Sequence, residues 1–193
     1  RMAYMFWQLM HAEEPYLTDD LSEEMKVART TTIGDLNRLR KAIEKYDLKI
    51  KGKANTGLAL CGDEFNIRLF ILENIYEQLY LNFPLGQTIR EKLYDFQERL
   101  SMDALGFGFF YRFFVVMIQR MESGHTIKKL KPKYEELYES SAYMIVDEFL
   151  NEIEQVKGYK ISKEERLFLS ISVAGMRTPA NTAEIEQKIS ISK

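Results

Sequence analysis

Few side chains in this sequence have the type and spacing that chemistry on a substrate requires. The two histidines, His11 and His125, lie far apart in the chain, and Cys61 is the single cysteine. Beside a glycine at the end of a predicted strand, Cys61 is expected to be a small buried side chain rather than a nucleophile. The sequence contains no zinc-protease motif, no paired cysteines and no glycine-rich phosphate loop. We therefore expect a protein that is not an enzyme, with no catalytic residue, metal ligand or cofactor.

Binding chemistry is concentrated in one basic stretch. Between Lys26 and Lys53 the chain carries nine Lys and Arg residues against three Asp and Glu residues. The whole protein is nearly neutral, at net charge −2, and the preceding stretch from Glu13 to Glu24 holds six acidic residues. A local basic stripe in a nearly neutral chain indicates a surface that binds an anionic partner such as nucleic acid.

The first third of the chain, which contains the basic stretch, is predicted to fold as helices followed by a hairpin. Residues Met2–His11 and a segment that begins with Thr18 have the pattern of two short helices, with Thr18 as the cap of the second. A longer helix is predicted over about 29–46, with most basic side chains off its apolar stripe. That predicted stripe consists of Ile33, Leu36, Leu39, Ile43 and Tyr46. Alternating residues over 48–51 and 58–60 predict two strands joined by a Gly- and Asn-containing loop.

Helix, turn, basic helix and hairpin, in that order, are typical of a winged helix-turn-helix. In such a domain the start of the second packed helix contacts base edges in the major groove, and basic residues contact phosphates. Gly34 lies inside this helix at a cost of roughly 1 kcal/mol relative to alanine, which indicates a close approach. The predicted DNA-binding residues are Arg29, Thr30, Thr31, Ile33, Asn37 and Arg38 on the helix, and Lys49, Lys51, Lys53 and Asn55 on the wing. The pattern alone also allows hydroxyls that cap the helix and lysines that solvate a hairpin.

The rest of the chain has a helical pattern throughout. Helices are predicted over 64–82, 86–101, 104–123, 134–157 and 162–175, with Pro and Gly residues between them. Six aromatic residues lie within the eight positions Phe107–Phe114, as expected for a core helix or for a dimer interface. No apolar run reaches the roughly 18 residues of a membrane span, because Arg112 interrupts the longest one.

Two stretches of the first third resemble a known family of regulators. The stretch Val27–Leu39 resembles the second-helix signature VSRTTIxxDLxxL of BglG/LicR/MtlR-type regulators, which the sugar phosphotransferase system controls. The stretch Lys51–Arg68 is similar to the wing and exit of the same family, KxxxGYxLxGxExxIR. Here Ala28 replaces a capping Ser, Gly34 replaces a polar or basic residue, and Leu58 replaces a common Tyr. The resemblance implies a transcription regulator that binds duplex DNA.

The helical half resembles the regulation domain of the same family, called the PRD. The stretches Phe113–Ile127 and Ile161–Ser172 are similar to its patterns HLxxxxxRxxxGxxI and IxxxExxYLxLH. In the family the two matched histidines accept phosphate from the phosphocarrier HPr or from sugar-specific transport components. Phe113 and Ser172 occupy those positions and cannot form phosphohistidine, so neither is expected to be a phosphoacceptor. The resemblance implies a homodimer that relays phosphorylation from elsewhere, with contact to phosphotransferase proteins such as HPr.

These observations predict a mainly α protein. A winged helix-turn-helix with a small β-hairpin wing is expected over 1–65, an all-helical PRD bundle over 66–180, and a polar tail over 181–193. We expect a cytoplasmic transcriptional activator of a sugar phosphotransferase operon, without membrane contact, and a chain that is a piece of a longer protein. The alternatives are an interaction module that does not read DNA, an RNA-binding antiterminator and a small helical enzyme. Antiterminators begin with a β-rich RNA-binding domain, and the helical start argues against that class.

Overall fold

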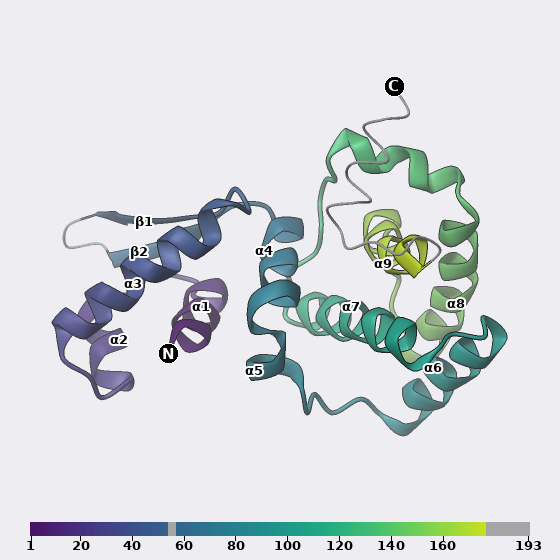
Figure 1. Cartoon of the computed structure of the whole chain (residues 1–193), viewed down its shortest axis with the longest axis horizontal. Helices are drawn as coiled ribbons and strands as arrows, with labels where there is room; N and C mark the ends of the chain where they lie inside the picture. Colours follow the sequence, from purple (N-terminus) through teal and green to yellow (C-terminus); the bar gives the residue numbers. More distant parts are fainter. Residues whose placement is uncertain (54–56, 177–193) are drawn as a thin grey trace. The chain divides into compact units, whose positions relative to one another are not determined.

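The chain forms two compact units, Arg1–Leu81 (unit 1) and Asn82–Lys193 (unit 2) (Figure 1). The structure, a computed structural model, describes residues 1–53 and 57–176. The predicted mainly α fold is confirmed, because helices make up most of the described residues and the regular strands among them form one two-stranded hairpin. Asn55 and the predicted tail over 181–193 lie outside the described residues.

Unit 1 contains three helices, a hairpin and a final helical segment. They are α1 (Met2–His11), α2 (Thr18–Glu24), α3 (Arg29–Glu44), β1 (Lys49–Lys53), β2 (Gly57–Cys61), α4 (Glu64–Phe70), the π-helical turn η1 (Ile71–Ile75) and α5 (Tyr76–Tyr80). The predicted order of helix, turn, basic helix and hairpin is therefore confirmed. Phe6 of α1 and Leu39 of α3 are fully buried, as expected where these two helices pack together.

The hairpin gains a short third partner that the sequence pattern did not predict. Tyr16 pairs with Leu58 of β2 through two backbone hydrogen bonds of 2.8 and 2.7 Å. Gly57, which precedes Leu58, has a left-handed φ of +91°, and a Cβ there would lie 2.8 Å from the carbonyl oxygen of Pro15. Because this pairing involves one residue, it produces no alternation that a sequence pattern could reveal.

The start of α2 contradicts the prediction that Thr18 caps this helix. Thr18 is the first helical residue, Leu17 occupies the cap position, and no side chain accepts a hydrogen bond there. Asp19 and Asp20 lie in the first turn instead. Their carboxylates interact favourably with the positive end of the helix dipole. Charge in the first turn thus takes the place of a capping side chain.

The buried stripe of α3 differs from the predicted one at its beginning. The Ile33 side chain is 39% exposed, whereas the other members of the predicted stripe are buried. Thr32 is fully buried in its place, and its hydroxyl accepts a hydrogen bond from Ser22 Oγ at 2.8 Å. A hydroxyl with a hydrogen-bond partner can enter a core at little cost. This arrangement leaves Ile33 on the outer side of α3.

Helix α4 belongs to the core of unit 1. Phe70 is fully buried, and its ring centroid lies 4.5 Å from that of Phe6 and 5.4 Å from that of Tyr46. Residue 65, the predicted end of the first domain, falls inside α4, whereas unit 1 extends to Leu81. Aromatic packing that joins α4 to α1 and to Tyr46, just after α3, explains this extension.

The predicted helix over 64–82 contains a π-helical turn, η1. At this turn Tyr46 Oη donates to Glu73 Oε2 at 2.5 Å and accepts from Asn74 Nδ2 at 2.7 Å. Ile75, at the end of the turn, has a φ of −136°. A π turn inserts an extra residue into a helix, and apolar spacing alone does not predict it.

Unit 2 is a helical bundle built around α9. Its elements are α6 (Gln87–Arg99), α7 (Ala104–Glu122), the 3-10 segment η2 (Pro132–Glu139), α8 (Ser141–Lys157) and α9 (Lys163–Met176). Helix α9 packs against α7, α8 and η2 (Figure 1), and residues 167–173 are all buried. The predicted helix over 134–157 is two elements, because Ser140 Oγ caps α8 by accepting from the Tyr143 backbone N–H at 3.1 Å.

The aromatic run of α7 is buried in its second half. Phe110 and Phe114 pack against Phe149 of α8, with ring centroids 5.6 and 5.7 Å apart. Leu105, near the start of α7, is 84% exposed. Among the described residues, α7 is the one helix long and apolar enough to cross a membrane, and 50% of that window is buried. Its contacts with α8 and α9 account for the apolar side chains of the buried half.

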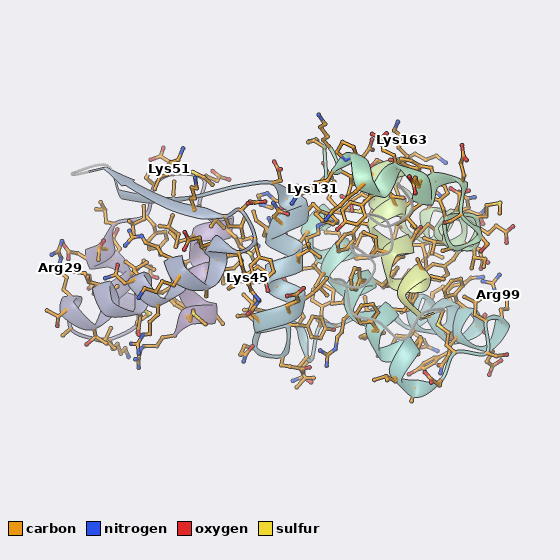
Figure 2. The ribbon with its side chains drawn as sticks, turned by 45° about the horizontal axis from the view of Figure 1, so that its top comes forward. Arg29, Lys45, Lys51, Arg99, Lys131 and Lys163 are labelled. Atoms are coloured by element: carbon orange, nitrogen blue, oxygen red, sulfur yellow. The ribbon has the colours of Figure 1, made fainter. Side chains whose placement is uncertain are left out.

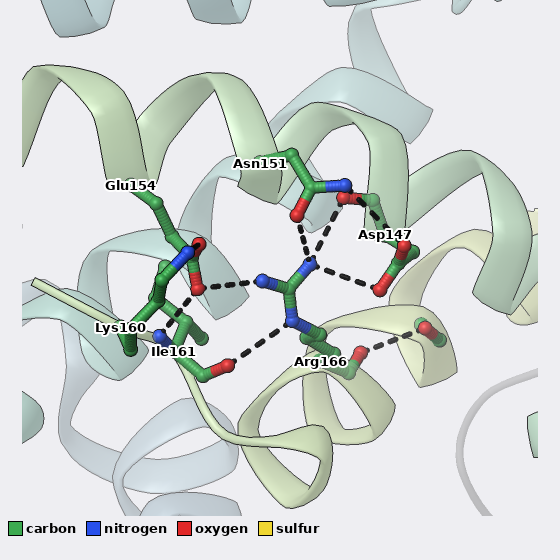
Figure 3. A network of polar contacts seen from close by, with 7 residues as sticks. Asp147, Asn151, Glu154, Lys160, Ile161 and Arg166 are labelled. Atoms are coloured by element: carbon green, nitrogen blue, oxygen red, sulfur yellow. Dashed lines mark hydrogen bonds and ion pairs between the residues drawn. The ribbon is translucent and has the colours of Figure 1, made fainter.

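A buried ion network joins α8 to the start of α9 (Figure 3). The Arg166 side chain is only 9% exposed, and its guanidinium donates to three side chains of α8. The acceptors are Glu154 Oε1 at 2.6 Å, Asp147 Oδ1 at 2.9 Å and Asn151 Oδ1 at 3.0 Å. Arg166 Nε also donates to the Ile161 carbonyl at 3.1 Å. This set of acceptors compensates the cost of burying the cation.

The network predicts that acid weakens unit 2 through Glu154. Burial alone would raise the pKa of Glu154, but the Ile161 backbone N–H, Lys160 and Arg166 together lower it from 4.5 to about 2. A carboxylate with a lowered pKa in the folded state contributes stability above the unfolded pKa, and this is lost as the pH falls through the folded pKa. We expect a loss of about 2–3 kcal/mol in the free energy of unfolding as the pH falls from 4.5 toward 2.

Urea denaturation followed by far-UV circular dichroism, repeated from about pH 6 down to about pH 2, measures this dependence. Glu154→Gln should remove much of it, because the variant has no carboxyl group to protonate. Glu148→Gln, at an exposed position of the same helix, is the matched control. An unchanged pH dependence in Glu154→Gln would contradict the assignment.

Candidate nucleic-acid interface

The turn between α2 and α3 determines how α3 is presented to solvent. Lys26 has a left-handed φ of 54°, and the Val27 N–H donates to the Ser22 carbonyl at 3.0 Å, which closes the turn. Ser22 Oγ also donates to Thr32 Oγ1, so a buried hydrogen bond joins the two helices beside the turn. This short connection holds α3 against α2 and leaves the opposite side of α3 open.

We define the outer face of α3 as Thr30, Ile33, Gly34 and Asn37. Ile33 and Gly34 follow Thr30 by three and four positions and precede Asn37 by four and three, so all four residues share one side of the helix. Thr30 and Asn37 are exposed, and Ile33 is 39% exposed. Thr31, at the edge of this face, is half-buried. Four of the predicted DNA-binding residues thus lie on or beside one accessible helical surface.

The two arginines beside the outer face are paired with carboxylates. Arg29 Nε lies 2.6 Å from Asp19 Oδ1, and both side chains are exposed. Arg38 Nη2 lies 2.5 Å from Asp35 Oδ1, while Arg1 Nε contacts the second oxygen of Asp35 at 2.5 Å. The hydrogen bond from Arg1, joined by that from Arg38, lowers the pKa of Asp35. A buried carboxylate therefore orients Arg38, whereas Arg29 is held by an exposed ion pair that a phosphate could displace.

The hairpin places two predicted lysines on one side of β1. Lys49 and Lys51 are both exposed, and side chains two residues apart on a strand point the same way. Figure 2 shows Lys51 on the hairpin and Arg29 at the start of α3, each extending outward from unit 1. Lys53 is the last residue of β1. Asn55, predicted on the same wing, lies outside the described residues.

This surface can form hydrogen bonds and ion pairs with a duplex. Hydroxyl and amide groups suit the donors and acceptors of base edges, and cations beside them suit the phosphates that border the major groove. Residues 1–74 match the family model of the Mga helix-turn-helix domain. Residues 1–74 are therefore similar to a helix-turn-helix domain of the Mga type, and we call them the Mga-type domain for this similarity. In this Mga-type domain α2 and α3 are the two packed helices, and β1 and β2 form the hairpin.

A curated regulator is similar to the chain beyond the Mga-type domain. The "Probable licABCH operon regulator" of Bacillus subtilis (strain 168) is 19% identical to this chain over an alignment 193 residues long. The alignment covers 92% of this chain. The alignment therefore extends into unit 2. The chain spans 30% of the length of that relative.

Sequence reasoning missed the roles of Asp19 and Asp35 in the Mga-type domain, counting them only as acidic charges. The spacing of Asp35 and Arg38, one helical turn apart, was a usable signal for their ion pair. The contact between Asp19 and Arg29 depends on the crossing of α2 and α3. No local pattern in the sequence contains that crossing.

The two positions that match phosphate-accepting histidines are buried in unit 2. Phe113 is 2% exposed, and its ring centroid lies 5.0 Å from that of Phe168. Ser172 is fully buried, and its Oγ donates to the Leu169 carbonyl at 2.6 Å. Phe113 lies on α7 and Ser172 on α9, and both side chains are part of the core of unit 2. The expectation that neither accepts phosphate stays a prediction.

The remaining reactive side chains are dispersed. Cys61 is half-buried at the end of β2, His11 packs against Trp7 with ring centroids 4.1 Å apart, and His125 lies just after α7. Within residues 1–53 and 57–176, no group of three or more His, Cys, Asp and Glu residues is placed to hold a metal ion. The outer face of α3 and the wing are thus the surface of unit 1 with the clearest binding chemistry.

Releasing Arg29 from its ion pair should strengthen DNA binding. Asp19→Asn preserves the size of the side chain but removes the charge that holds Arg29. We expect affinity for mixed-sequence duplex DNA to rise about two- to fivefold at low salt, because an exposed ion pair contributes about 1 kcal/mol at most. Fluorescence anisotropy with a labelled duplex measures the change.

Asp20→Asn is the matched control for this variant, because Asp20 is the next exposed carboxylate of α2. Equal gains from both variants would indicate a general charge effect and would contradict a specific release of Arg29.

Proposed function

We propose that this chain is part of a transcription regulator that binds duplex DNA through α3 and the wing of unit 1. The observation that carries this proposal is the outer face of α3, exposed within a domain that matches the Mga helix-turn-helix family. An α-helix fits the width of the major groove, and side chains near its start then reach base edges.

Each predicted residue has a distinct role in this proposal. Thr30, Thr31 and Asn37 supply hydroxyl and amide groups for base edges, and Ile33 supplies an apolar contact for a thymine methyl group. Arg29 and Arg38 contact guanine or the phosphates beside it. The wing residues contact phosphates and position the domain on the duplex; they are Lys49, Lys51, Lys53 and Asn55.

The regulated genes are proposed from similarity. The name of the curated relative supports control of an operon. The resemblance to BglG/LicR/MtlR-type regulators points to an operon for sugar uptake and to activation. It also points to control by phosphotransferase proteins such as HPr, and to a cytoplasmic location.

We also propose that unit 2 is a PRD that forms a homodimer. The support is an apolar surface around the start of α7, where Leu105 is 84% and Tyr94 57% exposed. A hollow of about 290 Å³ lies beside it, lined by Arg90, Leu93, Tyr94, Phe107, Gly108 and Tyr111. Contiguous apolar surface of this kind often marks an interaction site. With Phe113 and Ser172 at the motif positions, a phosphorylation signal would reach unit 2 from another part of the regulator.

The double variant Arg29→Ala with Lys51→Ala tests DNA binding by unit 1. It removes one cation from α3 and one from the wing, so we expect affinity for duplex DNA to fall about 10- to 100-fold. The slope of log affinity against log salt should decrease in size by about two, for two lost phosphate contacts. Anisotropy titrations at several salt concentrations measure both quantities, and light scattering on the same samples reports the association state.

The control is Lys128→Ala with Lys129→Ala, which removes two exposed cations from unit 2. Unchanged affinity in the Arg29 and Lys51 variant would contradict this interface. A wild-type chain that binds no duplex at low salt would contradict the proposed function itself.

A further inference from the structure

Gly34 stands inside α3 without a conformational or steric reason in the part of the chain that the structure describes. Its backbone is not among those with positive φ. A Cβ built on it meets no heavy atom within 4 Å. Glycine in a helix interior is less stable than alanine, because its backbone loses more conformational freedom on folding. Alanine would therefore fit and would stabilise the helix.

Other glycines of unit 1 differ from Gly34 in this respect. Gly57 and Gly62 have φ values of +91° and +149° and lie close to neighbouring atoms. Gly52 has a leucine side-chain atom 3.1 Å from its built Cβ. Each of these has a local reason in backbone geometry or packing, whereas Gly34 has open space beside it.

The neighbours of Gly34 indicate what uses this space. Gly34 lies at the centre of the outer face of α3, one turn after Thr30 and about one turn before Asn37. The polar side chains of that face are short, so their hydroxyl and amide groups reach only a little beyond the helix backbone. Such groups contact base edges only if the backbone itself comes close to the bases.

We propose that Gly34 is the point of closest approach between α3 and the base pairs, and that it determines how deeply α3 enters the major groove. This inference rests on the proposed function. A methyl group at this position would hold the helix away from the base edges and lengthen the hydrogen bonds of Thr30 and Asn37. Long, flexible cations such as Arg29 and Lys51 would still reach phosphates. Gly34 therefore contributes to sequence specificity rather than to general DNA affinity.

The test compares stability, specific binding and non-specific binding in the full chain. Duplexes are first enriched from a random-sequence library with the wild-type chain, and the enriched duplex and an unrelated mixed duplex serve as probes. Gly34→Ala is expected to raise the melting temperature by a few degrees. It should weaken binding of the enriched duplex about tenfold or more, while the mixed duplex changes by less than about twofold.

Thr88→Ala is the control, because Thr88 is an exposed residue of α6 outside the lining of the hollow, and alanine is the better helix former there. It should raise the melting temperature without changing the preference for the enriched duplex. Gly34→Leu should lose more specific affinity than Gly34→Ala, since the larger side chain displaces the helix further.

Two results would overturn the inference while leaving the proposed function intact. One is equal affinity of the wild type and Gly34→Ala for the enriched duplex. The other is a lower melting temperature for Gly34→Ala, which would show that Gly34 serves the fold. If the wild-type chain enriches no duplex and binds none at low salt, the proposed function fails and the inference fails with it.

Discussion

Replacing Arg166 with alanine is expected to lower the free energy of unfolding of unit 2 by about 3 kcal/mol. The variant leaves the Glu154 carboxylate, only 7% exposed, without the guanidinium that lies 2.6 Å away. It also removes the donor to the Ile161 carbonyl. Removing one partner of a buried ion pair costs about 3–5 kcal/mol. Glu154 keeps Lys160 and the Ile161 backbone N–H as partners, so we expect a loss near the lower end of that range. Total stabilities of domains are about 5–15 kcal/mol, so this loss is a large part of the whole.

Urea denaturation followed by far-UV circular dichroism measures the loss in unit 2. The single tryptophan of the chain, Trp7, lies in unit 1, so its fluorescence follows that unit separately. Arg99→Ala is the control, because Arg99 pairs with Glu152 at 2.9 Å on the surface and is 48% exposed. Its loss should be about 1 kcal/mol or less. Equal losses from the two variants would refute a special role for the buried network.

Replacing Gly57 with alanine should destabilise unit 1 by about 3 kcal/mol. A φ of +91° is unfavourable for any residue with a Cβ, at roughly 1–2 kcal/mol. The added Cβ would also lie 2.8 Å from the Pro15 carbonyl oxygen, a backbone atom that cannot turn away. To relieve that overlap, the strand contact of Tyr16 with Leu58 must open, which costs about a further 1–3 kcal/mol.

Trp7 fluorescence during urea denaturation reports this change, and amide hydrogen exchange at Tyr16 and Leu58 reports the opened pairing. Gly52→Ala, in the facing strand, is the control. Its Cβ would meet Leu58 Cδ2 at 3.1 Å, a flexible side-chain atom that can move aside, and the Gly57 carbonyl oxygen at an ordinary contact distance of 3.8 Å. We expect a loss of less than about 1 kcal/mol there. A Gly57→Ala chain as stable as the wild type would contradict the role of this glycine.

The periodicity of apolar residues predicted the helices and strands in which that periodicity lies within the element's own residues. Helix α3 shows apolar side chains at helical spacing, and the basic alternation at Lys49–Lys51 marks β1. The contact of Tyr16 with Leu58 and the π turn η1 depend on residues distant in the chain, so no window of sequence contains them. The same reason explains why Phe70 joins the core of unit 1 although the predicted boundary precedes it.

The sequence predicted where the candidate nucleic-acid interface lies, but it predicted fewer of the contacts between the residues of that interface. Exposure of Thr30, Asn37 and Arg38 follows from their positions relative to the apolar stripe of α3. The burial of Thr32 in place of Ile33 follows from one hydrogen bond across the α2–α3 turn, and Ser22, its donor, lies on another helix. Tertiary hydrogen bonds override side-chain hydrophobicity at such a position.

The central position of α9 has a consequence for folding during synthesis. Among the described residues, each helix that packs on α9 precedes it in the chain, and residues 167–173 fill the middle of unit 2. When α6 to α8 have left the ribosome, their apolar faces are therefore exposed until α9 follows and covers them. Unit 1 has all its core elements within its first 80 residues and can complete its fold earlier. The nascent chain should thus hold a folded unit 1 while unit 2 still requires protection from aggregation.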